Sequence, residues 1–124
     1  MNSASRSRLP VLIVEDNPHV QHLLTLYLKR AGYDAAHAAN GDDALALLQG
    51  GLTPCAILLD YHMPIMDGGR FRREQLARNL QTDIPVVLYS SDSMLREDDL
   101  QFKAVFSGHR LDYGMIVRAI EQSR

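Results

Sequence analysis

Short runs of apolar residues alternate along this chain with longer segments in which apolar residues recur every three or four positions. The short runs predict buried strands, and the longer pattern predicts helices with one apolar face. Strands that alternate with helices are typical of βα units around a parallel sheet, so we expect an α/β fold. Five strands are expected, over residues 9–14, 33–38, 55–59, 86–89 and 104–106.

Polar residues and glycines mark where the expected helices begin and end. Asn17 and Pro18 suit the start of the first helix, and Gly32 suits its end. The third helix has a thin apolar face, and its four arginines predict a solvated basic surface. Helices are expected to start after residues 17, 41, 67 and 112, with another over 93–101, and Asp67 and Asp112 are the expected caps of the third and the last.

The size and charge of the chain set the class of protein. Its 124 residues suit one domain, which we place at residues 9–124 after a disordered tail at 1–8. Thirteen basic and 15 acidic residues give a net charge of -2, which predicts no direct binding to nucleic acid or membranes. The apolar runs are too short to span a bilayer. Cys55 is the only cysteine and can form no internal disulfide, so we expect a cytoplasmic setting.

Three acidic residues stand where expected strands end. Glu15 and Asp16 follow the first strand, and Asp60 follows the third. The carboxyl ends of parallel strands meet at one edge of a sheet, so these carboxylates should lie together. Two such charges about 4 Å apart repel by roughly 4 kcal/mol at an effective dielectric near 20. A hard divalent cation with oxygen ligands removes that cost, which predicts a magnesium site and phosphoryl chemistry.

The segment from Asp60 to Gly68, Asp-Tyr-His-Met-Pro-Ile-Met-Asp-Gly, resembles the receiver domain of two-component response regulators. The acidic pair after the first strand and the segment 84–90, which ends in a hydroxyl residue, resemble the same family. The resemblance covers residues 9–122. It implies a doubly wound, flavodoxin-like sheet of five parallel strands in the order 2-1-3-4-5.

The resemblance also assigns roles to these residues. Asp60 would accept phosphate from the phosphohistidine of a sensor kinase or from a small phosphodonor. The receiver would catalyse its own phosphorylation and dephosphorylation and would otherwise be a signalling switch, not an enzyme. Mg²⁺ would bind Asp16 and Asp60 directly, Glu15 through water, and the backbone carbonyl of His62.

Signal relay would depend on a further set of residues. The resemblance makes Ser90 the hydroxyl that binds the phosphoryl group and Phe106 the aromatic residue that moves with it. The family carries Lys-Pro three residues beyond this aromatic position, where His109 and Arg110 stand here. A cis bond before Arg110 would cost about 2.5–4 kcal/mol, so we expect a trans bond and a loop of different shape.

Partners follow from the same resemblance. A sensor histidine kinase or a histidine phosphotransfer protein would supply or receive the phosphate, and a downstream protein would read the changed surface. That surface would consist of the fourth helix, the fifth strand and the last helix, through which a homodimer could also form. The loss of Lys-Pro favours an alternative, a receiver-like interaction module that works without phosphorylation.

Other site chemistries fit the sequence less well. A flavodoxin would need a phosphate-binding loop after the first strand, where Glu15 and Asp16 would repel a flavin phosphate. A phosphatase of the haloacid dehalogenase type would need Asp-x-Asp there. His19 and His22 lie one helical turn apart, but two ligands without a third predict solvated surface.

Overall fold

Five parallel strands form one sheet in the order β2-β1-β3-β4-β5. The protein is represented by a computed structural model that describes residues 9–90, 101–108 and 112–122. The order confirms the doubly wound topology, in which the chain starts in the middle of the sheet and extends to both edges. The strands are β1 (Val11–Val14), β2 (Ala35–Ala38), β3 (Ala56–Asp60), β4 (Val86–Ser90) and β5 (Ala104–Ser107).

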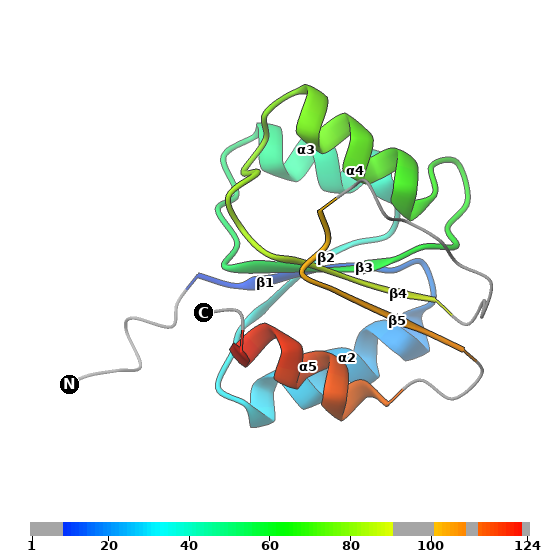
Figure 1. Ribbon diagram of the computed structural model, residues 1–124. Helices are drawn as coiled ribbons and strands as arrows, with labels where there is room; N and C mark the ends of the chain where they lie inside the picture. The colour runs from blue at the N-terminus through cyan, green and yellow to red at the C-terminus, as the bar shows by residue number, and fades with distance from the viewer. Residues whose placement is uncertain (1–8, 91–100, 109–111, 123–124) are drawn as a thin grey trace.

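Helices cover both faces of the sheet, so the molecule has three layers (Figure 1). Helices α3 and α4 lie on one face, and α2 and α5 lie on the other. The predicted fourth helix falls mostly on residues 91–100, outside the described residues, and Gln101 belongs to no helix. The helices are α2 (Pro18–Arg30), α3 (Gly41–Gln49), α4 (Gly68–Ala77) and α5 (Tyr113–Gln122), and in the described part of the chain none is long and apolar enough to cross a bilayer.

Alternation along the central strands creates two apolar cores. On β1, Val11 and Ile13 pack on the α2/α5 face, and Leu12 and Val14 pack on the α3/α4 face. All four side chains are fully buried. A strand that is apolar on both faces is typical of a parallel sheet with helices on either side. This burial fixes the register and so fixes which side chains emerge at the strand ends.

Helix α2 begins and ends as its sequence predicts. The Asn17 side chain accepts hydrogen bonds from two backbone N–H groups of the first turn, as an N-cap does. At the other end Gly32 has a φ of 93°, and the Tyr33 N–H donates to the Leu28 carbonyl. These contacts form a Schellman motif. Tyr33 therefore belongs to the helix end, and β2 starts at Ala35, two residues later than predicted.

Helix α4 differs from its prediction. Asp67 caps it as expected, through its side chain and the Arg70 N–H. The solvated basic surface is wrong at Arg72, which is 3% exposed. The Arg72 guanidinium donates to the side chain of Gln75 and to the backbone carbonyl of Gln101 and lies over the ring of Phe102. Arg72 therefore ties α4 to the start of β5.

Candidate functional site

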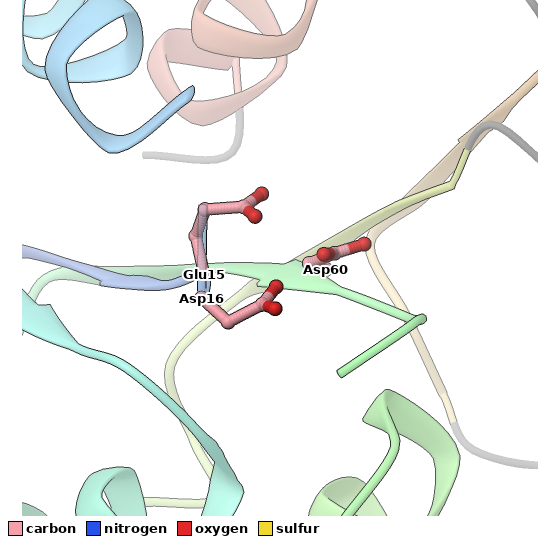
Figure 2. Close-up of side chains that lie close together, drawn as sticks. All are labelled: Glu15, Asp16 and Asp60. Atoms are coloured by element: carbon pink, nitrogen blue, oxygen red, sulfur yellow. The ribbon is translucent and has the colours of Figure 1, made fainter. Parts of the chain in front are cut away.

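Glu15, Asp16 and Asp60 come together at the carboxyl edge of the sheet, as predicted, and are called the acidic cluster below. Figure 2 shows the three side chains, two from the end of β1 and one from the end of β3. One carboxylate oxygen from each lies within 4.8 Å of the others. The cluster lines a cavity of about 290 Å³ together with Asn17, Val20, His62, Tyr89 and Tyr113.

The alternation of the strands determines which residues share this cavity. Glu15 continues the series of Val11 and Ile13, so it lies on the α2/α5 side of the sheet. Asp60 continues the series of Ala56 and Leu58 on the same side. Asp60 is also the direct neighbour of Tyr89 in the pairing of β3 with β4, and Tyr89 belongs to the same core cluster.

Glu15 is the most tightly held member of the acidic cluster. Its side chain is 3% exposed. The Tyr89 hydroxyl donates to Oε1 at 2.6 Å, and the Asn17 N–H donates to Oε2 at 3.0 Å. The side-chain amide of Gln21 donates to the backbone carbonyl of Glu15. Asp16, in contrast, is exposed.

Electrostatic crowding in the acidic cluster shows in the pKa values of its members. Burial, followed by the negative charge of Glu15, raises the pKa of Asp60 to about 8. Burial also raises the pKa of Glu15, although the hydrogen bonds from Tyr89 and Asn17 oppose that rise. The shift at Asp60 means that the cluster retains a proton near neutral pH when no cation compensates its charge.

The donor set suits a hard divalent cation. The acidic cluster offers only carboxylate oxygens, which Mg²⁺ and Ca²⁺ prefer to nitrogen or sulfur ligands. A spacing within 4.8 Å allows one cation, with its waters, to contact all three side chains. The chemistry of the donors therefore fits the magnesium predicted from the sequence.

The other predicted site residues lie at different depths around this edge. The His62 N–H donates to Asp60 Oδ1 at 3.2 Å, and His62 lines the cavity. Ser90 ends β4 and is 1% exposed. Phe106 is half-buried against the α2/α5 core. His109 and Arg110, with the peptide bond between them, lie outside the described residues, as does the end of the chain beyond 122.

Sequence reasoning missed the tyrosines of the cavity. Tyr89 was predicted only as part of a buried strand, although its hydroxyl is the direct partner of Glu15. A tyrosine within an apolar run is a usable signal, because a buried hydroxyl normally needs a hydrogen-bond partner. His19 and His22 are exposed, as predicted.

Comparison with known proteins identifies the family. The response regulator receiver domain family matches residues 11–107. LuxN, an autoinducer 1 sensor kinase/phosphatase of Vibrio harveyi, is 33% identical over 90 residues, which is 73% of this chain but 10% of LuxN. PilH of Pseudomonas aeruginosa is 34% identical over 82 residues, 65% of this chain and 66% of PilH. The chain thus matches only a small part of LuxN and just under two thirds of PilH.

Solved structures agree with this fold. A response regulator receiver protein from Pseudomonas putida superimposes with a TM-score of 0.82 at 24% identity, over 93% of this chain and 97% of that one. The response regulator TrrA from Thermotoga maritima, solved with Mg²⁺ and BeF, gives a TM-score of 0.78 at 24% identity, over 93% and 98%. Because the family match covers most of its length, the chain belongs to the response regulator receiver domain family.

Proposed function

We propose that this receiver domain is the phosphoacceptor of a two-component or phosphorelay system, with Asp60 as the acceptor and Mg²⁺ as the cofactor. The observation that carries the proposal is the acidic cluster, whose three carboxylates lie within 4.8 Å of one another. Such a cluster costs free energy unless a cation compensates it. Asp60 sits in that cluster at the end of β3, beside an open cavity.

The proposed chemistry is nucleophilic attack by an Asp60 carboxylate oxygen on the phosphorus of a phosphohistidine. The new P–O bond forms as the P–N bond breaks, and the imidazole leaves with the bonding electrons and takes up a proton. Mg²⁺, held by Glu15, Asp16, Asp60 and the His62 carbonyl, would neutralise charge on the phosphoryl oxygens. The same site would return the acyl phosphate to carboxylate by hydrolysis.

Signal output is proposed to follow from Ser90 and Phe106. Ser90 ends the strand next to β3, and its hydroxyl is proposed to bind a phosphoryl oxygen on Asp60. Phe106 is half-buried against the α2/α5 core, so a second position of its ring would change the surface near β5 and α5. A downstream protein, or a second copy of the chain, would read the altered surface near β5 and α5.

The partners follow from this chemistry. A cytoplasmic sensor histidine kinase, or a histidine phosphotransfer protein, is the proposed source or recipient of the phosphate. One relative of this chain, LuxN, is a sensor kinase/phosphatase, which supports this class of partner.

The second candidate function is an interaction module that does not depend on phosphorylation. The sequence His109-Arg110, at the place of the family's Lys-Pro, favours it. The complete acidic cluster favours the phosphoacceptor.

One experiment separates these two functions. Acetyl phosphate and Mg²⁺ should add one phosphoryl group to the wild-type protein, as read by intact mass. Asp60→Asn should abolish the addition, and Asp83→Asn, an exposed aspartate just before β4, should not. A folded wild-type protein that gains no mass would support the interaction module instead.

A further inference from the structure

We infer that Tyr89 is a positioning residue for the acidic cluster, because its hydroxyl fixes the Glu15 carboxylate beside Asp60. The inference rests on the proposed function, since the position of Glu15 matters to activity only if the cluster binds a cation and Asp60 accepts phosphate.

The Tyr89 side chain crosses the strand that carries Asp60. In the sheet, β3 lies between β1 and β4. Tyr89 is on β4, directly beside Asp60, while Glu15 follows β1 on the far side of β3. Neighbouring strands are about 4.8 Å apart, so a contact between the outer two needs a long side chain. Tyrosine is long enough and carries a donor at its tip.

The hydrogen bond itself is of the strong kind. The separation of 2.6 Å between the Tyr89 hydroxyl and Glu15 Oε1 falls within the range of about 2.5–2.7 Å for a hydroxyl that donates to a carboxylate. Both side chains are almost fully buried, Tyr89 at 2% and Glu15 at 3%. Water therefore competes little with this contact, and the hydroxyl proton is directed to Glu15.

The two donors to Glu15 fix the positions of both of its oxygens and leave further acceptor positions on the carboxylate. Tyr89 occupies one lone pair of Oε1, and the Asn17 N–H occupies one lone pair of Oε2. A carboxylate has about four acceptor positions, so two remain for the Asp60 carboxyl, which also hydrogen-bonds to Glu15, and for a cation that displaces the Asp60 proton. A cation or its bound water can use these positions without a rotation of the side chain. Partners of this kind orient metal ligands in many proteins.

The setting of Tyr89 within its strand also supports a specific role for its hydroxyl. The preceding residues of β4, Val86, Val87 and Leu88, are apolar and buried. Phenylalanine would fill the same space without a polar atom. The hydroxyl is therefore the one feature of this side chain that the apolar core does not explain, and its partner is a member of the acidic cluster.

The test uses Tyr89→Phe in the full chain, because this variant keeps the ring and removes only the donor. We expect its dissociation constant for Mg²⁺, from NMR titration, to rise about 10-fold. Phosphorylation by acetyl phosphate should slow at low Mg²⁺ and recover at saturating Mg²⁺. Tyr33→Phe, which removes a hydroxyl from the same core cluster at the other end of α2, is the control for a purely structural loss and should leave Mg²⁺ affinity unchanged.

A double-mutant cycle with Glu15→Gln decides whether Tyr89 acts through Glu15. The single change Glu15→Gln should weaken Mg²⁺ binding, and Tyr89→Phe should then add little. If Glu15→Gln weakens binding and Tyr89→Phe does not, the inference about Tyr89 is wrong and the proposed function stands. If the wild-type protein neither binds Mg²⁺ nor gains phosphate, the proposed function is wrong, and this inference falls with it.

A measurement on the hydroxyl proton covers the case in which Tyr89→Phe does not fold. In the wild-type protein the buried Tyr89 hydroxyl should give a slowly exchanging, downfield NMR signal. Glu15→Gln replaces the charged acceptor and should move that signal upfield. A signal that is unchanged by Glu15→Gln would overturn the inference.

Discussion

Asp60 carries a proton near neutral pH in the absence of a cation, because its pKa is raised to about 8. A cation that binds the ionised cluster must displace this proton, so binding and deprotonation are coupled. We therefore expect the dissociation constant for Mg²⁺ to rise as the pH falls from about 8.5 to 6.5. Calorimetry in two buffers of different ionisation enthalpy should also detect proton release. An affinity that does not change over this range would contradict the prediction.

The same proton affects the stability of the metal-free protein. The folded-state pKa of Asp60 lies above the ordinary aspartate value of 3.8, so the folded state binds the proton more tightly than the unfolded state. This contribution to the free energy of unfolding is fully present below pH 3.8 and is lost as the pH rises through about 8. Asparagine cannot ionise, so Asp60→Asn should remove this loss.

Thermal unfolding in a chelator checks this expectation. The melting temperature of Asp60→Asn should exceed that of the wild-type protein at pH 8.5, and the difference should shrink at pH 5. Saturating Mg²⁺ should reverse the order, because the variant lacks one ligand. A variant that melts well below the wild-type protein at pH 8.5 in chelator would mean that the Asp60 carboxylate has a structural role.

At the scale of the element, helix α4 starts in direct contact with the strand that carries Asp60. A Cβ on Gly68 would lie 2.8 Å from the Asp60 carbonyl oxygen and 2.9 Å from Tyr61 Cα, both backbone atoms. Gly68→Ala should therefore lower the free energy of unfolding by about 1–3 kcal/mol. It should also weaken Mg²⁺ binding, because the backbone at Asp60 must shift. Chemical denaturation and magnesium titration measure the two effects.

Gly32→Ala is the matched control for that change. Gly32 has a φ of 93° and nothing within 4 Å of an added Cβ. The cost there should be about 1–2 kcal/mol, from the left-handed backbone alone. Mg²⁺ affinity should stay the same, because Gly32 follows the C-terminal end of α2, whereas Glu15 and Asp16 precede its N-terminal end. Equal losses of affinity in the two variants would exclude a specific effect of Gly68 on Asp60.

Local sequence signals were sufficient where the determining contacts are local. The cap at Asn17 and the stop at Gly32 were predicted because both depend on residues within one turn of α2. The acidic cluster was predicted because parallel strands bring their carboxyl ends to one edge. Arg72 was misplaced because its partners at Gln101 and Phe102 come from another part of the chain. The same holds for Tyr89, whose partner is 74 positions away.

At the scale of the whole molecule, we expect His109 or Arg110 to take the place of the family's lysine, and only a role for His109 would depend on pH near neutrality. Histidine has an unperturbed pKa near 6.5, whereas lysine stays charged to about pH 10. If His109 pairs with the phosphoryl group, His109→Gln should slow phosphorylation by acetyl phosphate at pH 6.5, and His109→Lys should restore or exceed the wild-type rate at pH 8. Intact mass against time measures these rates. Equal rates in all three proteins, with activity lost in Arg110→Ala, would assign the role to Arg110, and no effect from any of these changes would mean that no cation is needed there.

The order of strands in the sheet also has a consequence for how the chain folds. The neighbours of β1 are β2 and β3, so the first half of the chain, through Asp60, contains a complete three-stranded unit with both flanks of β1 paired. β4 can then pair with the free edge of β3, and β5 with β4. Strand β1 is fully buried and paired on both sides, whereas β5 is an edge strand whose residues alternate between half-buried and exposed. We therefore expect the transition state for folding to be structured around β1, with high φ-values there and low values at β5. The acidic cluster, at the ends of β1 and β3, would then be assembled before β5, which belongs to the proposed output surface.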